Sequence, residues 1–244
     1  MKKILLIAIS TLLLMSCSKK NTTEVLPTPT GSLTGRVVLN NSQGAVVENA
    51  AGVTVSLDST SYNTTTDSLG NYTLKNIPQG IYTITYNKSG YSIHKMIDVT
   101  IDAGNAPIVA SYVNLYEPSS VQITSFSAKL DSPNVNVSVT INPPSSNSSF
   151  AYYAPTVLVF MSTSPSVSSV NYISTYNIDF QYGNGNSISE DISSYYLNYP
   201  SGSKIYLIAY PNSYNEDSYL NPATGRTVYE GLGTPSSVVP VTLP

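Results

Sequence analysis

Few residues of this 244-residue chain can support acid–base, nucleophilic or metal chemistry. The chain contains one histidine, His94, and one cysteine, Cys17. A zinc site made of histidine and cysteine needs about four ligands, and a serine–histidine–aspartate triad could use only His94. A single cysteine also excludes an internal disulfide bond. We therefore expect His94 to be an ordinary strand or loop side chain without a chemical role.

Acidic residues near predicted turns are the next candidates for chemistry. Asp58 with Asp67, or Glu216 with Asp217, could contribute to a calcium site. Calcium prefers about six to eight oxygen ligands, and no loop here has acidic residues that dense. A pair of carboxylates could also hydrolyse a glycosidic bond, so a hydrolase with an unrecognised site stays an alternative. We predict that the protein uses no metal and no cofactor.

Tyrosine is the residue type best suited to binding, because the chain has 20 tyrosines but only 4 phenylalanines and no tryptophan. A tyrosine ring can stack on a sugar or pack against a protein partner, and its hydroxyl can form a hydrogen bond. Tyrosine also favours half-buried strand positions, so each tyrosine could instead pack in a strand and bind no ligand. We expect the stretches Ser187–Tyr199 and Asn212–Tyr229 to be loops that present the ligand-binding side chains Tyr195, Tyr196, Tyr199, Tyr214 and Tyr219.

The N-terminus has the pattern of an export signal. Lys2 and Lys3 precede an apolar run from Ile4 to Met15, which is too short to span a bilayer but suits a secretory signal. The residues that follow, Leu14-Met15-Ser16-Cys17, resemble the lipobox of bacterial lipoproteins. The resemblance implies a signal peptide over residues 1–16 and a lipid attached to Cys17. Two or three acyl chains would then hold the protein at a membrane.

Residues 17–30 read SKKNTTEVLPTPT after the cysteine, a polar and proline-containing composition typical of a flexible tether. Ser18 follows the cysteine in place of the aspartate that retains enteric lipoproteins at the inner membrane. We therefore expect an outer-membrane location. Bacteroides-type bacteria export such proteins to the cell surface with an acidic run after the cysteine, which Lys19, Lys20 and Glu24 match in part. The periplasmic face of the outer membrane is the alternative location.

The rest of the chain predicts an all-β protein with two consecutive antiparallel β-sandwich domains. Between residues 31 and 117, β-rich runs alternate with turn signals such as Asp67-Ser68-Leu69-Gly70-Asn71. Five segments follow in order: GRVV from Gly35, AGVTVSL from Ala51, TDSLGNYTL from Thr66, IPQGIYTITY from Ile77, and Gly90-Tyr91. Together they resemble the carboxypeptidase regulatory-like domain, and the resemblance implies a transthyretin-like fold and an accessory, non-catalytic module.

A second strand series is predicted over residues 119–244, after Pro118 interrupts the pattern. The segment from Pro200 to Tyr210 is similar to the turn and penultimate strand of a fibronectin type III or other Ig-like domain. Asn221-Pro222-Ala223-Thr224-Gly225-Arg226 is typical of a last hairpin. This resemblance implies a second sandwich, although the tryptophan usual in such domains is absent.

The charge of the chain argues against one class of partner, and two short motifs indicate a modification. The formal net charge of −3, with only 10% charged residues, excludes the basic surface expected of a nucleic-acid-binding protein. Asp58-Ser59-Thr60 and Asp67-Ser68-Leu69 match the acceptor pattern for O-glycosylation in Bacteroides-type bacteria, which implies modification of Ser59 and Ser68.

The sequence thus predicts a non-enzymatic, lipid-anchored envelope protein that binds a glycan or protein partner or acts in adhesion. The alternative is a structural or accessory subunit of an outer-membrane transport or surface assembly, with no soluble ligand of its own.

Lipid attachment at Cys17 can be tested by substitution. We expect Cys17→Ala to move the protein from the detergent phase to the aqueous phase after phase separation, because no acyl chain can then attach. Ser16→Ala keeps a small residue before the cysteine and serves as the control. A Cys17→Ala protein that stays in the detergent phase with its signal cleaved would contradict the prediction.

Overall fold

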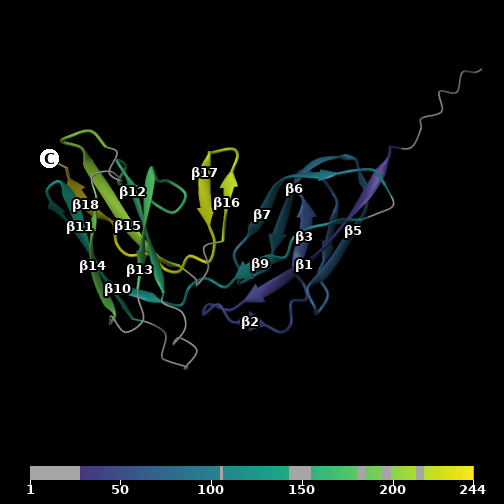
Figure 1. Cartoon of the computed structure of the whole chain (residues 1–244), viewed down its shortest axis with the longest axis horizontal. Coiled ribbons are helices and arrows are strands. Elements are labelled where there is room, and N and C mark those ends of the chain that lie inside the picture. Colours follow the sequence, from purple (N-terminus) through teal and green to yellow (C-terminus); the bar gives the residue numbers. More distant parts are fainter. Residues whose placement is uncertain are drawn as a thin grey trace, which may run out of the picture.

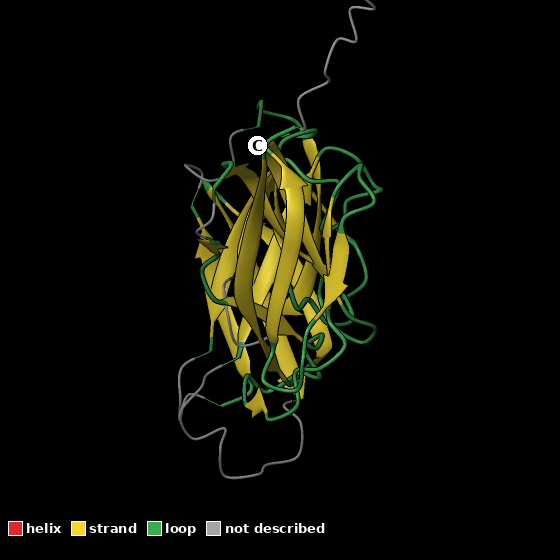
Figure 2. Cartoon of the chain, turned by 90° about the vertical axis from the view of Figure 1, so that its right-hand side faces the viewer, coloured by secondary structure: helices red, strands yellow, loops and turns green. Residues whose placement is uncertain are grey.

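A computed structural model describes residues 28–104, 107–142, 155–180, 185–193, 199–212 and 217–243. These residues form eighteen strands in two groups, which lie side by side along the length of the molecule (Figure 1). Only strands and loops occur in the described residues (Figure 2). The predicted all-β class with two antiparallel β-sheet domains is confirmed. No described helix has the length and apolar character needed to cross a membrane.

The first domain consists of two sheets built from nine strands. In one sheet the long strand β1 pairs antiparallel with β2 and β5 and parallel with β8 and β9. In the other, the order is β4-β3-β6-β7, and all pairs are antiparallel. The strands are β1 (Thr30–Asn40), β2 (Val46–Val47), β3 (Thr54–Leu57), β4 (Asn63–Thr65), β5 (Asn71–Pro78), β6 (Gly80–Asn87), β7 (His94–Ile101), β8 (Ile108–Val109) and β9 (Val113–Tyr116).

Alternation along these strands produces the core between the two sheets. Leu33, Val37 and Leu39 of β1 are buried, while the residues between them are less so. Tyr86 on β6 is the largest fully buried side chain, and its hydroxyl lies 2.7 Å from the hydroxyl of Tyr72 on β5. Burial raises the pKa of both phenols above the usual value, so both stay neutral. Their mutual hydrogen bond satisfies two polar groups inside an apolar core.

The second domain also pairs two sheets, of order β10-β11-β14 and β13-β12-β15-β18, and adds the hairpin β16-β17. Strand β9 ends at Tyr116 and β10 begins at Gln122, so the predicted boundary near Pro118 falls between two strands. The strands are β10 (Gln122–Asp131), β11 (Asn134–Asn142), β12 (Thr156–Ser162), β13 (Ser174–Asp179), β14 (Ser187–Ile192), β15 (Lys204–Asn212), β16 (Ser218–Asn221), β17 (Arg226–Tyr229) and β18 (Val239–Thr242).

Strand β14 corrects the expectation that Ser187–Tyr199 is a loop. It pairs antiparallel with β11, and polar side chains join the two strands: Ser189 with Ser138, and Asp191 with Asn136. The strand contains Glu190 and Asp191, and both residue types are depleted in strands, so this strand has no clear signal in the sequence. Cross-strand hydrogen bonds and the buried Ile192 stabilise it instead.

Strand β12 is buried on both faces, and this explains much of the tyrosine content. One face contributes to the core between the sheets; the other places Phe160 in a second, aromatic cluster. The Phe160 ring lies edge-on to the rings of Tyr172, Tyr210 and Tyr229, at centroid distances of 5.0, 5.4 and 5.5 Å. Such edge-to-face pairs stabilise packing beyond the area they bury. These three tyrosines therefore have the structural role that the sequence left as an alternative.

A buried carboxylate connects the two domains. Glu230 follows β17, and its side chain is only 1% exposed. One of its oxygens lies 2.6 Å from Nδ1 of His94 at the start of β7, and the other accepts a hydrogen bond of 3.3 Å from the Ser92 hydroxyl. Figure 1 shows β16 and β17 next to β7. His94 is a strand residue, as expected, but it contacts the other domain.

One further contact supports this interface, and another holds the segment between β9 and β10 against the second domain. The ring of Tyr219 on β16 lies edge-on to the ring of His94, at 6.3 Å between centroids. The backbone N–H of Ser119 donates to the carbonyl of Gly231, at 2.8 Å. A buried carboxylate is costly without partners, so Glu230 favours the one arrangement of the domains that supplies them.

Removing this carboxylate should weaken the contact between the two domains. Glu230→Ala leaves the His94 imidazole and the Ser92 hydroxyl without their partner, a change that costs on the order of 3 kcal/mol in a buried pair. We expect small-angle scattering to show a larger maximum dimension and hydrogen exchange to rise in β7 and β16. Glu48→Ala, at an exposed position, is the matched control. Unchanged scattering and exchange in Glu230→Ala would contradict a carboxylate-dependent interface.

Candidate functional site

A pocket lies on the first domain where the pairing of β1 with β8 and β9 changes register. Thr34 pairs with Val109, but pairing resumes only at Val37 with Val113. Three residues, 110–112, therefore lie opposite two residues of β1. One residue is in excess, so the ladder is interrupted and the alternation of side chains shifts. Val113 and Leu115 point into the core, whereas Tyr112 is turned outwards.

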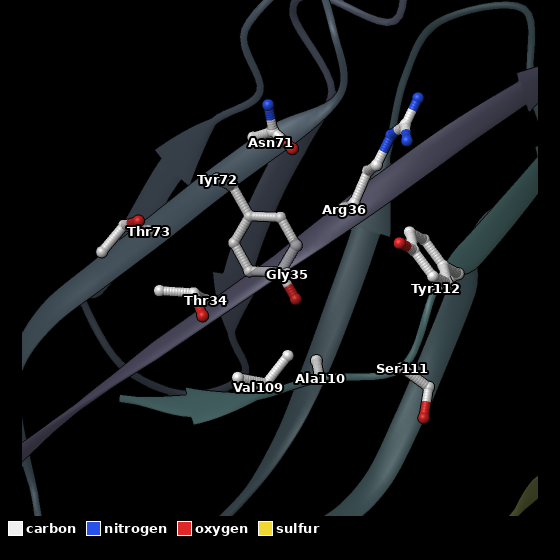
Figure 3. A pocket seen from close by; sticks show the side chains of 10 residues that line it. All are labelled: Thr34, Gly35, Arg36, Asn71, Tyr72, Thr73, Val109, Ala110, Ser111 and Tyr112. Atoms are coloured by element: carbon white, nitrogen blue, oxygen red, sulfur yellow. The ribbon is translucent and has the colours of Figure 1, made fainter. Parts of the chain in front are cut away.

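We call this feature the Gly35 pocket; it has a volume of about 630 Å³. This lies within the range typical of ligand sites, about 300–1,000 Å³. Figure 3 shows Arg36 and Tyr112 close together, with Thr34 and Val109 further along β1 and β8. The lining residues are Thr34, Gly35, Arg36, Asn71, Tyr72, Thr73, Val109, Ala110, Ser111 and Tyr112.

Gly35 is required by the ring that lies across it. A Cβ atom at this position would come 2.4 Å from the Tyr72 hydroxyl oxygen and 2.6 Å from its Cζ. Tyr72 pairs with Gly35 across β5 and β1, and the contact of its hydroxyl with Tyr86 holds the ring. Gly35, which lines the pocket, therefore lies directly against one ring of the buried pair Tyr72 and Tyr86.

At one end of the pocket, Arg36 and Tyr112 support each other. The Nε–H of Arg36 donates to the carbonyl oxygen of Leu69 at 2.9 Å. Its guanidinium carbon lies 5.9 Å from the centroid of the Tyr112 ring, within the range of a cation–π contact. Tyr112 is 72% exposed, so much of its ring is open to a ligand. The pair forms a polar and aromatic platform.

The turn before β5 positions Asn71 beside this platform. One Asp67 oxygen accepts hydrogen bonds from the backbone N–H groups of Leu69 and Asn71, at 2.9 and 2.8 Å, and the other accepts from the Asn71 amide at 3.2 Å. The hydrogen bond from the Asn71 backbone lowers the pKa of Asp67. Gly70 completes the turn with φ +83°, which glycine adopts without strain.

A second, smaller pocket of about 470 Å³ lies on the second domain. It borders the aromatic cluster, and the Tyr229 hydroxyl on its wall lies 3.1 Å from the Thr175 hydroxyl. The remaining lining is mostly amide and hydroxyl groups, and no lining residue is charged. Leu158, Thr175, Asn177, Asn212, Ser218, Thr227 and Tyr229 line it.

The predicted binding tyrosines do not form one platform among the described residues. Tyr199 is half-buried against the second-domain core, with its hydroxyl 3.0 Å from that of Ser174. Tyr219 is half-buried next to His94 at the domain interface. Tyr195, Tyr196 and Tyr214 lie outside the described residues, so their binding role stays a prediction.

Of the other predicted residues, one lies outside the described ranges and the structure places the rest. Cys17 lies outside the described residues. Ser59 and Ser68 are both exposed in turns, where a glycosyl group would have room, but their modification stays a prediction. Asp58 forms an ion pair with Lys95 at 2.6 Å. No group of three or more potential metal ligands occurs in the part of the chain that the structure describes.

Tyr112 is the residue that sequence reasoning missed. The β-rich run Ile108–Leu115 contains a conflict in its alternation: Ile108 is at an even-numbered position, whereas Val113 and Leu115 are at odd-numbered positions. All three contribute to one core, so the strand must contain an extra residue between them. That conflict was a usable signal for an outward-turned segment containing Tyr112.

Comparison with known families identifies the first domain. The sequence model of the carboxypeptidase regulatory-like domain matches residues 32–113. The chain therefore contains this domain, followed by a further β domain. No curated protein matches the sequence. The fibronectin type III or Ig-like nature of the second domain stays a prediction.

Several solved structures are distantly similar. A candidate carbohydrate-binding protein from Bacteroides uniformis is 12% identical, with 88% of this chain and 100% of that chain covered and a TM-score of 0.34. A DUF3823 family protein from Bacteroides ovatus is 13% identical, with 88% and 100% covered and a TM-score of 0.33. The major pilin subunit of Bacillus cereus is 16% identical, with 87% and 69% covered and a TM-score of 0.30. Similarity at this level identifies no ligand.

The dependence of the pocket on Gly35 can be measured. We expect Gly35→Ala to destabilise the first domain by about 1–3 kcal/mol, because the new methyl group overlaps the Tyr72 ring. The melting temperature should fall by roughly 5 °C or more. Gly104→Ala, where nothing lies within 4 Å of the new Cβ atom, should melt like the wild type. Equal melting of both variants would show that the Tyr72 ring can move away freely.

Proposed function

We propose that this protein is a non-enzymatic, lipid-anchored module of the cell envelope that binds glycans through the Gly35 pocket. The observation that carries the proposal is the exposed ring of Tyr112, held beside Arg36 at the edge of a pocket on a rigid sheet. A sugar ring has one or two apolar faces that can stack on such an aromatic ring, and its hydroxyl groups need polar partners nearby.

The pocket supplies those partners. Thr34 and Thr73 pair across β1 and β5, and Ser111 lies on the opposite wall. Their hydroxyl groups can both donate and accept hydrogen bonds, as sugar hydroxyls do. All three are exposed or half-buried, so a ligand can reach them. The pocket thus combines stacking with adaptable hydrogen bonding, which suits a polyhydroxylated ligand better than a purely apolar one.

The lining also supports binding without hydrolysis. Glycoside hydrolysis uses two carboxyl groups on either side of the scissile bond. None of the ten residues that line the Gly35 pocket is an aspartate, a glutamate or a histidine. The matched family model describes a regulatory-like domain rather than a peptidase domain, and this supports the same proposal. A glycan bound here would therefore leave the pocket without being hydrolysed.

The location is part of the proposal. A lipid on Cys17 and a tether over residues 17–30 would hold the first domain near the outer membrane. Strand β1 begins at Thr30, so the tether leads directly into the strand that forms the pocket. A glycan-binding role fits the outer surface better than the periplasmic face, because polysaccharides reach the cell from outside.

The alternative function, a structural or accessory subunit, has one specific observation in its favour. The buried contact of Glu230 with His94 and Ser92 ties the two domains together, which suits a rigid spacer. The two functions differ in whether the isolated protein has a soluble ligand. A glycan-binding measurement therefore separates them.

We expect Tyr112→Ala to weaken glycan binding about fivefold or more, because a stacked ring contributes on the order of 1 kcal/mol. The test is a glycan array, followed by calorimetry on the glycan that binds, with the chain from Ser18 onwards. Ile81→Ala is the matched control, since Ile81 is 69% exposed on the other sheet. Binding that survives in Tyr112→Ala but is lost when Tyr195, Tyr196 and Tyr214 are replaced would move the site to the second domain.

A further inference from the structure

We infer that the Gly35 pocket selects glycans that carry a carboxylate group, such as uronic acid chains, and that Arg36 recognises the carboxylate. This inference rests on the proposed glycan-binding function and adds the class of ligand. Arg36 is the only charged residue among those that line the pocket.

The arginine is positioned so that its donors stay available. The Nε–H is used by the carbonyl oxygen of Leu69, and the guanidinium carbon lies 5.9 Å from the Tyr112 ring centroid. These two contacts fix the orientation of the planar guanidinium group. The two terminal nitrogens keep their N–H groups, and a guanidinium binds a carboxylate through two parallel hydrogen bonds of this kind. A preorganised arginine loses less entropy when it binds.

No carboxylate of the protein neutralises this arginine within the described ranges. There, Asp58 is paired with Lys95, and Glu230 is bound by His94 and Ser92. Asp67 lies in the turn before β5, and its carboxylate oxygens accept hydrogen bonds from Leu69 and Asn71 rather than from Arg36. The charge of Arg36 is therefore left for a ligand.

The neighbouring groups make a sugar carboxylate a better occupant than an isolated anion. Arg36 lies over the Tyr112 ring, and the 72% exposure of Tyr112 leaves ring surface open to a sugar. In a uronic acid the carboxylate projects from the edge of the sugar ring, so a sugar on the open surface of Tyr112 can extend its carboxylate past the ring to Arg36. Thr34 and Thr73 lie further along β1 and β5, where they would meet the hydroxyl groups of the next sugar in a chain.

The test compares two glycans that differ only in charge. Calorimetry with the chain from Ser18 onwards measures binding of an oligogalacturonate and of the same oligosaccharide as its methyl ester. We expect the acid to bind about tenfold tighter than the ester, as expected for a hydrogen-bonded charge pair. Added salt should weaken binding of the acid but not of the ester.

Substitution of Arg36 provides the second part of the test. Arg36→Gln should reduce binding of the acid about tenfold and so remove its preference over the ester, and Arg36→Lys should restore only part of the loss, because lysine cannot form the paired hydrogen bonds. Lys75→Gln is the matched control: it removes an exposed positive charge from β5 outside the pocket. Unchanged melting of Arg36→Gln would show that the fold is intact.

The outcomes separate the inference from the function on which it rests. Equal binding of acid and ester, unaffected by Arg36→Gln, overturns the inference and leaves glycan binding standing. Binding of neither glycan, together with no hit on the array, overturns the proposed function itself. A pentaglutamate peptide that binds as tightly as the oligogalacturonate also overturns the inference, because the ligand would then be an acidic peptide.

Discussion

Hydrogen bonding along strand β1 is the constraint on which the first domain depends. Four other strands pair with β1. Strands β2 and β5 are antiparallel to it, and each pairs with only part of its length. Strands β8 and β9 are parallel to it, and a change of register separates them. Side chains alternate along a strand, so the register of each pair decides which residues enter the core. The extra residue among 110–112 keeps Val113 and Leu115 in the core and turns Tyr112 outwards. Core and pocket therefore follow from the same irregularity.

The domain interface follows a different physical rule. Glu230 is almost fully buried, and its partners come from the first domain, so neither domain alone satisfies this carboxylate. Apolar contacts can be exchanged for others at small cost, whereas a buried charge needs specific partners. The contact of Tyr219 with His94 adds an aromatic neighbour to this pair. A tyrosine predicted to bind ligand thus has a packing role at the interface.

The tyrosines show how one residue type can serve two purposes. Tyr172, Tyr210 and Tyr229 surround Phe160 on the outer face of a sheet, where each ring packs edge-on and covers apolar surface. Tyr72 and Tyr86 share a hydrogen bond inside the first core. Tyr112 has neither role, because it is strongly exposed and contacts a cation. Abundance of tyrosine in a segment therefore says little about binding; exposure decides it.

The sequence by itself determined the all-β class and the two strand series, because alternation and turn residues act over a few neighbouring positions. It also predicted turns such as the one around Asp67 and Gly70 for the same reason. Its similarity to a known family identified the carboxypeptidase regulatory-like region. Strand β14, the partner of His94 and the pairing of β1 that turns Tyr112 outwards were decided only by the tertiary structure. Each depends on residues far apart in the chain: Ser138 with Ser189, His94 with Glu230, and the register of β1 against residues 110–112. Local patterns carry no information about such pairings, which arise only when distant strands meet.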